Sequence, residues 1–310
     1  MFIQNERGTA DTQKERETGR RTDTPRNLCD IHTLRPLLER HGFRFSKSMG
    51  QNFLIDDTIP PRIAAASEAD RSRGVLEIGP GAGVLTVELA KRAGRVVSVE
   101  LDRSLLPVLR ETLAPCPNAE VVEGDALKLD LAALAAEKFD GLTPVVCANL
   151  PYNITTPILT RLIDTPCFLT VTVLLQKEVA RRLSAPPGSP DGGAFSLYLH
   201  YHMEAEYLFD VPRDRFLPAP RVDSAVLRCV RRDRPAVETA DEAFFFRVVR
   251  GGFLLRRKTL ANSLSAAGFP KEAVRAAMER CGLPDRVRGE ALTLEQYADL
   301  ARNLGERGKE

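Results

Sequence analysis

The sequence predicts an α/β fold, in which a mostly parallel sheet is covered by helices on both faces and followed by a smaller helical part. Three observations lead to this prediction. Short apolar runs alternate with helix-like periodic segments from about residue 57 to 184. Two more strand-like runs, 195–208 and 222–231, have no helix between them. After residue 241 the pattern is helical only. Alternating strands and helices are typical of a parallel sheet with helices on its two faces.

The composition is that of an ordinary globular protein. The chain has 310 residues, of which 43% are hydrophobic and 28% charged, which is enough apolar material for a sizeable core. Lys and Arg total 44 against 42 Asp and Glu, a net charge of +2, so any affinity for nucleic acid must come from a local patch. No apolar run approaches the roughly 18 residues of a membrane helix, and the N-terminus lacks a secretory pattern. Six widely spaced cysteines without a Cys-x-x-Cys pair indicate reduced thiols in a cytoplasmic protein without a metal site.

Three parts follow from the pattern along the chain. Residues 1–30 carry six acids, six bases and almost nothing apolar, so we predict a disordered tail. Residues 31–235 form the predicted α/β domain. Residues 236–310 form the predicted helical domain, in which Gly268 and Gly282 are expected to end helices.

Within the α/β domain, each strand is predicted from a short apolar run and each helix from apolar residues at helical spacing. The expected strands are 75–79, 95–100, 119–124, 145–149 and 168–175. The expected helices are 59–69, 83–93, 103–113, 131–138, 155–163 and 176–184. The runs 195–208 and 222–231 would form an antiparallel hairpin at the sheet edge, with His200 and His202 on one strand face. The last four helices are expected at 242–254, 257–266, 271–280 and 294–304.

A glycine-rich turn follows the first of these strands. The segment VLEIGPGAGVLT (75–86) runs from strand through Gly79, Gly81 and Gly83 into a helix. Glycines allow a sharp turn and a close approach of a ligand to the backbone, and the helix N-terminus favours a negative group. A dinucleotide fingerprint requires glycine or alanine where Val84 stands. The pattern therefore favours S-adenosylmethionine over a dinucleotide, against the alternative of a plain tight turn.

Two acids follow the next strands. Glu100 ends the second strand, 21 residues after Gly79, where a carboxylate can accept hydrogen bonds from both ribose hydroxyls. Asp125 ends the third strand, where it can accept a hydrogen bond from an adenine amine. Either acid alone could be a solvated strand end, but the two in register with the glycine turn indicate a cofactor site.

The fourth strand runs into Asn149-Leu150-Pro151-Tyr152, the most informative stretch of the sequence. An adenine amine is a poor nucleophile because its lone pair is delocalised into the ring. Acceptors aimed at its two N–H bonds would help it become tetrahedral, and the Asn149 side chain and the Leu150 carbonyl are the candidates. Pro151 would stiffen the turn, and Tyr152 would offer a face for stacking. The alternative is a turn with an asparagine cap.

With these motifs the sequence resembles the small-subunit ribosomal RNA adenine N6,N6-dimethyltransferases, the KsgA type, from about Ser46 to Leu264. The motifs that carry the resemblance are SKSMGQNFLID, VLEIGPGAGVLT, VVSVELD, EGDAL, ANLPYNITTPIL, LLQKEVARRL, FLPAPRVDSAV and FLLRRKTLANSL. The resemblance implies a class I S-adenosylmethionine-dependent methyltransferase (Rossmann-like) sheet with an antiparallel edge hairpin. It also implies dimethylation of two adjacent adenosines near the 3′ end of small-subunit (16S) rRNA in the immature 30S particle. We expect a monomer with no membrane partner.

The resemblance also implies roles for single residues. Asn52 and Leu54 would close over the cofactor, with Gly79, Gly81, Glu100, Asp125 and Asn149 as further contacts. Asn149, Leu150, Pro151 and Tyr152 would hold the target base, and Phe216 would be its second stacking face. For Phe216 the alternative is an anchor buried in the core.

Basic residues gather between Val211 and Lys258, where twelve bases stand against six acids. Cations of this kind neutralise RNA phosphates. We expect Arg221, Arg256, Arg257 and Lys258 to contact RNA.

Two rival functions stay open at this point. The first is that of a related group that methylates large-subunit RNA, which usually carries Ile or a similar residue where Leu150 stands. A non-catalytic RNA- or DNA-binding factor would keep the fold without needing the cofactor turn and the Asn-Leu-Pro-Tyr stretch.

Overall fold

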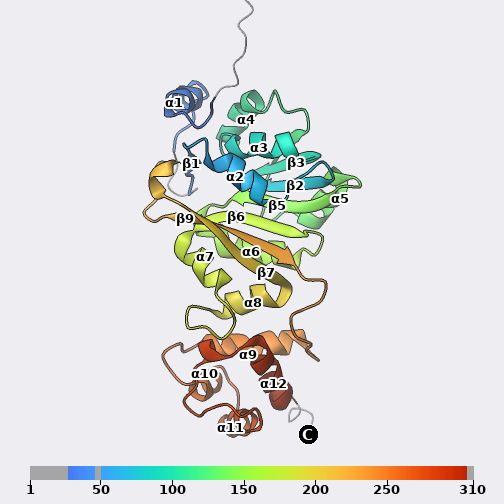
Figure 1. Ribbon diagram of the computed structural model, residues 1–310, viewed down its shortest axis with the longest axis vertical. Coiled ribbons are helices and arrows are strands. Elements are labelled where there is room, and N and C mark those ends of the chain that lie inside the picture. Colours follow the sequence, from blue (N-terminus) through green and yellow to red (C-terminus); the bar gives the residue numbers. More distant parts are fainter. Residues whose placement is uncertain (1–26, 46–49, 306–310) are drawn as a thin grey trace, which may run out of the picture.

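The computed structural model describes residues 27–45 and 50–305. Most of the tail expected at 1–30 lies outside these residues. The fold class is confirmed: a seven-stranded sheet lies above a small helical domain (Figure 1). None of the described helices is long and apolar enough to cross a membrane.

The main sheet has the strand order β4-β3-β2-β5-β6-β9-β7. Its strands are β2 (Arg73–Ile78), β3 (Arg95–Glu100), β4 (Ala119–Glu123), β5 (Thr143–Asn149), β6 (Thr170–Gln176), β7 (Met203–Val211) and β9 (Ser224–Arg231). The first five are parallel, and β9 runs antiparallel to both β6 and β7. The expected edge hairpin is confirmed. All five parallel strands therefore present their carboxyl ends at one edge, where α/β sheets bind ligands.

Alternate residues of the strands face two separate apolar layers, because side chains of a strand point to opposite faces. Val75 packs with α2 (Ile59–Ala66) and α3 (Val84–Arg92), whereas its neighbour Leu76 packs with helices of the other face. These are α5 (Leu131–Phe139), α6 (Thr155–Asp164) and α7 (Lys177–Ser184). Burial on both faces explains why these strands are near-continuous apolar runs in the sequence.

One helix near the start of the described residues was not predicted. α1 (Ile31–Arg40) begins after Asp30, whose carboxylate accepts the His32 N–H. Its buried leucines pack with α4 (Leu106–Thr112). The segment is only ten residues long and contains Pro36, a residue that usually breaks helices, so its sequence does not indicate a helix.

The segment predicted as the first part of a strand, 195–202, is instead a helix, α8 (Ala194–His202). Leu197, Leu199 and Tyr201 alternate as in a strand, but they are buried on different sides of the helix. Leu197 and Tyr201 pack into the small domain, and Leu199 packs under the sheet. His200 and His202 accordingly lie on a helix and not on a strand face.

A second sheet of two short strands was also missed. β1 (Phe53–Leu54) pairs antiparallel with β8 (Phe216–Leu217), so that Leu54 lies opposite Phe216. The Ile55 N–H donates to the Arg215 carbonyl at 2.9 Å. Strands of two residues leave no alternation to read, so only the structure brings these distant segments together.

The small domain packs its own core. Its helices are α9 (Glu242–Phe253), α10 (Leu260–Ala266), α11 (Lys271–Arg280) and α12 (Leu294–Gly305). Their apolar faces form a cluster separate from those of the sheet, joined only by residues of α8 among its buried members. Gly268 and Gly282 follow helix ends with positive φ, as predicted. The boundary at residue 236, between β9 and α9, stays a prediction.

Candidate active site

The glycine turn between β2 and α3 forms the floor of a pocket at the carboxyl edge of the sheet. Gly79, Gly81 and Gly83 all have positive φ, between +61° and +86°. A Cβ on Gly83 would also lie 3.0 Å from the Leu113 side chain. Other residues would be strained in this backbone, so the glycines here are required by its conformation.

Residues from four parallel strands line the same pocket. They are Glu77 and Ile78 of β2, Glu100 of β3, Asp125 after β4, and Asn149 at the end of β5. Asn52 and Leu54 line it from the opposite side. Of the expected cofactor contacts, Asn52, Leu54, Gly79, Gly81, Glu100, Asp125 and Asn149 all lie at this pocket. The sequence thus predicted which strand ends converge, because parallel strands place their carboxyl ends together.

Glu100 is a buried carboxylate, 5% exposed, at the end of β3. It accepts the Asp102 N–H at 2.8 Å. Burial raises the pKa of Glu100 to about 7, because the charged form loses hydration. Hydroxyl donors from a ligand would favour the charged form.

Asp125 is less buried and partly engaged. Its Oδ1 accepts the Leu127 N–H at 2.9 Å, and Oδ2 lies 3.6 Å from the Lys128 ammonium. These contacts hold the turn that follows β4, and Asp125 lines the pocket there.

Glu77 lines the pocket and was missed in the sequence. Its carboxylate is 1% exposed, and Oε2 accepts the hydroxyls of Thr86 and Ser98, both at 2.6 Å. Burial raises the pKa of Glu77 to about 7. A single acid inside the apolar run VLEIG was the signal that could have identified it.

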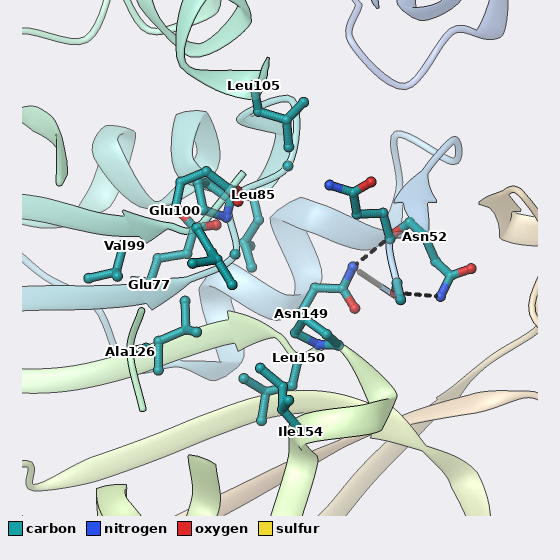
Figure 2. A pocket seen from close by; sticks show the side chains of 18 of the residues that line it. Asn52, Glu77, Leu85, Val99, Glu100, Leu105, Ala126, Asn149, Leu150 and Ile154 are labelled. Atoms are coloured by element: carbon teal, nitrogen blue, oxygen red, sulfur yellow. Dashed lines mark hydrogen bonds between the residues drawn. The ribbon is translucent and has the colours of Figure 1, made fainter. Parts of the chain in front are cut away.

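Asn149 is oriented by a chain of hydrogen bonds, which Figure 2 shows as dashed lines. Its Nδ2 donates to the Asn52 carbonyl at 3.1 Å, and the Asn52 Nδ2 donates to the Gly50 carbonyl at 3.1 Å. With the amide nitrogen facing Asn52, the oxygen of Asn149 is left for a different donor. This is the orientation that an acceptor for an amine N–H requires.

Leu150, Pro151 and Tyr152 continue from Asn149 around the pocket mouth. Leu150 and Pro151 line the pocket, whereas Tyr152 is half-buried outside its lining. The Tyr152 hydroxyl lies 2.5 Å from the Ser224 hydroxyl at the start of β9. Burial raises the pKa of Tyr152, so the phenol stays neutral. The ring is thereby fixed next to the pocket, and Ser224 is a second residue that the sequence analysis missed.

The expectation that Phe216 offers an open stacking face is wrong for this structure. Its ring is 2% exposed and packs with Leu54, Leu174 and Val226. Pairing of β8 with β1 turns the ring into the core, as the alternative of a core anchor predicted.

The other expected RNA contacts lie outside the pocket. Arg221 is exposed in the turn before β9. Arg256, Arg257 and Lys258 are exposed in the turn 254–258 between α9 and α10. The Arg256 guanidinium is partly engaged, because it donates to the Gly192 carbonyl at 3.4 Å and lies 3.6 Å from Glu290.

The turn 254–258 is held from below by Ser263, which is fully buried. The Ser263 hydroxyl accepts the Leu255 N–H at 2.9 Å and donates to the Gly251 carbonyl at 2.7 Å. The Lys258 N–H closes the turn on the Leu255 carbonyl at 2.8 Å.

The described part of the chain contains no group of three or more His, Cys, Asp or Glu side chains placed to hold a metal ion.

Comparison with known proteins adds a family to this geometry. The family described as "Ribosomal RNA adenine dimethylase" matches residues 42–305. The chain is 46% identical over 276 residues to "Ribosomal RNA small subunit methyltransferase A" of Geobacillus sp. (strain WCH70), covering 87% of this chain and 95% of that protein. It is 47% identical to the protein of the same name from Streptococcus sanguinis (strain SK36), covering 91% and 99%.

Solved structures show the same fold. The 23S rRNA methyltransferase ErmE superposes with a TM-score of 0.64 and 32% identity, covering 82% of this chain and all of the other. A dimethyladenosine transferase from Plasmodium falciparum superposes with a TM-score of 0.70 at 24% identity, covering 83% and 98%.

Proposed function

Since the chain belongs to the ribosomal RNA adenine dimethylase family and is therefore a methyltransferase, we propose that it dimethylates N6 of two adjacent adenosines near the 3′ end of small-subunit rRNA. S-adenosylmethionine is the proposed methyl donor. The proposed substrate is the immature 30S particle, on which the protein would act as a monomer in the cytoplasm.

The observation that carries this proposal is the meeting of a cofactor pocket with the Asn149-Leu150-Pro151-Tyr152 turn. Glu100, Asp125 and Asn149 line one pocket from three strand ends. A buried carboxylate at the end of β3, such as Glu100, fits a ribose diol, because it can accept hydrogen bonds from both hydroxyls. A binding protein without catalysis would not require a preoriented amide at the pocket mouth.

The residues of this chain would act mainly by positioning. When bound, S-adenosylmethionine supplies an electrophilic methyl group that leaves its sulfur for N6 of the adenine. The Asn149 oxygen and the Leu150 carbonyl accept hydrogen bonds from the N–H groups of that amine, two before the first transfer and one before the second. They draw the nitrogen towards tetrahedral geometry, which frees its lone pair from delocalisation into the ring. The amine becomes acidic as it gains the methyl group, so its proton passes to water without a strong base.

Asn52 contributes through its backbone. Its carbonyl holds the Asn149 nitrogen at 3.1 Å, which directs the Asn149 oxygen away from Asn52. Positioning of this kind provides about 7–11 kcal/mol in favourable cases. The ring of Tyr152, fixed by Ser224, offers the face on which the adenine stacks.

The small-subunit substrate is favoured by the degree of similarity. Relatives at 46–47% identity carry the small-subunit name, whereas the protein named for 23S rRNA is 32% identical. Leu150 stands in the turn, as the resemblance to the small-subunit group implies.

The test uses small subunits isolated from cells that lack this gene. They are incubated with the protein and tritiated S-adenosylmethionine, and the digested RNA is analysed for N6,N6-dimethyladenosine. We expect two dimethyladenosines per small-subunit RNA and none in large-subunit RNA. Cofactor binding without any methylated product would overturn the proposal in favour of a binding protein.

A further inference from the structure

A groove lined with cations lies outside the cofactor pocket. It is lined by Lys177 and Arg181 of α7, Arg213, Arg221 and, among acids, Glu178 and Asp223. Lys177 is already paired with Asp210. Among the described residues, no carboxylate lies within ion-pair distance of the guanidinium of Arg213 or of Arg221.

Asp223 connects this groove to the Asn149-Leu150-Pro151-Tyr152 turn. Its carbonyl accepts the Lys177 N–H at 3.0 Å, and its carboxylate accepts the Arg213 N–H at 3.0 Å. The next residue, Ser224, holds the Tyr152 hydroxyl. The Arg213 side chain also donates to the Arg221 carbonyl at 3.3 Å. The short segment 221–224 therefore holds the Tyr152 ring through Ser224 and holds Arg213 through Asp223 and the Arg221 carbonyl.

On the side of Arg181 the groove adjoins a loop that contacts the small domain. Arg181 lines both this groove and a second hollow, which is bordered by the loop 185–193 between α7 and α8. That loop reaches the small domain, since Arg256 donates to the Gly192 carbonyl. In Figure 1 the loop after α7 hangs from the sheet towards α9 and α10. The turn 254–258, with three cations, lies at this contact.

We propose that Arg213 and Arg221 bind backbone phosphates of the RNA next to the target adenosine. The RNA strand then continues past Arg181 to the turn 254–258. The inference rests on the proposed function, because the occupant is RNA. Guanidinium groups that are not neutralised by a carboxylate, beside a base-holding turn, match a phosphodiester chain, whose charges repeat at every nucleotide. A base presented to the Asn149 turn must be unstacked, so its flanking phosphates need such a hold.

The first experiment measures binding of a fluorescein-labelled single-stranded RNA of about twenty nucleotides by anisotropy at several salt concentrations. We expect the pair Arg213→Glu and Arg221→Glu to raise Kd at least about tenfold. The slope of log Kd against log salt should fall by about 1.4, or 0.7 for each lost phosphate contact. The matched control is the pair Arg92→Glu and Arg110→Glu, exposed arginines of α3 and α4, which should change Kd less than about twofold.

Equal losses in the groove and control pairs, or an unchanged slope in the groove pair, would overturn the proposal. Equilibrium dialysis with S-adenosylmethionine verifies that each variant is folded. If the glutamate pair loses the cofactor, Arg213→Gln with Arg221→Gln replaces it, and the slope must still fall.

A second experiment tests the path to the small domain. Arg257→Glu with Lys258→Glu should weaken binding of the twenty-nucleotide RNA but not of one about five nucleotides long, which the groove alone can hold. The groove pair should weaken both. If the small-domain pair weakens the binding of both RNAs equally, the RNA strand does not follow this path.

These outcomes are separable from those of the proposed function. If the protein methylates no RNA while the groove pair still loses RNA affinity, the methylation proposal is wrong and the proposal of RNA binding in the groove is supported. If the groove pair methylates small subunits with unchanged KM, the proposal of RNA binding in the groove is wrong and the methylation proposal is supported. With both correct, KM for the subunit rises while kcat changes less than threefold.

Discussion

At the scale of single residues, a change at Asn149 distinguishes the two parts of the proposed function, which are cofactor binding and methyl transfer. Replacing it with Ala removes the acceptor for the amine but leaves Glu100, Asp125 and the glycine turn in place. We expect Asn149→Ala to keep cofactor affinity within about fivefold and to lower kcat at least about 100-fold, since about 3 kcal/mol of positioning is lost. Dialysis and single-turnover methylation measure the two effects. A normal rate would exclude the Asn149 oxygen from the reaction.

Glu100 gives the cofactor site a dependence on pH. With a pKa of about 7, the Glu100 carboxyl group must lose its proton before both of its oxygens can accept hydrogen bonds from two hydroxyls. We therefore expect affinity for S-adenosylmethionine to rise about tenfold between pH 6 and 8 in the wild type. Glu100→Gln should bind more weakly and lack this component. Parallel pH profiles of the two proteins would contradict the assignment.

Glu77 makes a prediction about stability. Its folded pKa of about 7 lies above the value near 4.5 of an unfolded chain, so the folded protein binds the extra proton. Its contribution to the free energy of unfolding is complete below pH 4.5 and is lost as pH rises through 7. Relative to Glu77→Gln, the wild type should lose about 2 kcal/mol between pH 5 and 8. Urea unfolding across this range measures the difference, and a constant difference would contradict it.

At the scale of elements, the pairing of β1 with β8 decides the role of Phe216. A ring buried against Leu54 and Val226 should stabilise the fold, so Phe216→Ala should cost about 3–5 kcal/mol of unfolding free energy. Phe216→Leu fills most of the space and should cost about 1 kcal/mol with turnover within threefold of the wild type. A leucine variant that is stable yet loses turnover about 100-fold would show that the ring stacks on the base after all.

The same scale shows how far the sequence leads. Strands buried on both faces, such as β5 and β6, are visible as apolar runs, and their parallel order brings Glu100, Asp125 and Asn149 together as predicted. The helix α8 was mistaken for a strand because it is buried on several sides, which removes the polar face that marks a helix. Glu77 and Ser224 were missed because their roles depend on partners distant in sequence.

At the scale of the whole molecule, α8 joins two cores. Leu199 belongs to the sheet cluster and Leu197 to the small-domain cluster, so neither core can lose this helix alone. We expect one cooperative thermal transition. S-adenosylmethionine at 100 times its Kd should stabilise both parts together, by about 2.7 kcal/mol. Calorimetry measures this, and two transitions of which only one shifts would contradict it.

The hydroxyl of Ser263 beneath the turn 254–258 has a consequence for molecular recognition. A surface segment whose backbone is already fixed gives up little conformational entropy when a partner settles on it. Its complexes should then form with fast, weakly temperature-dependent association, as between preshaped surfaces. Ser263→Ala would leave every charge in place and yet impose on each encounter the cost of ordering five residues.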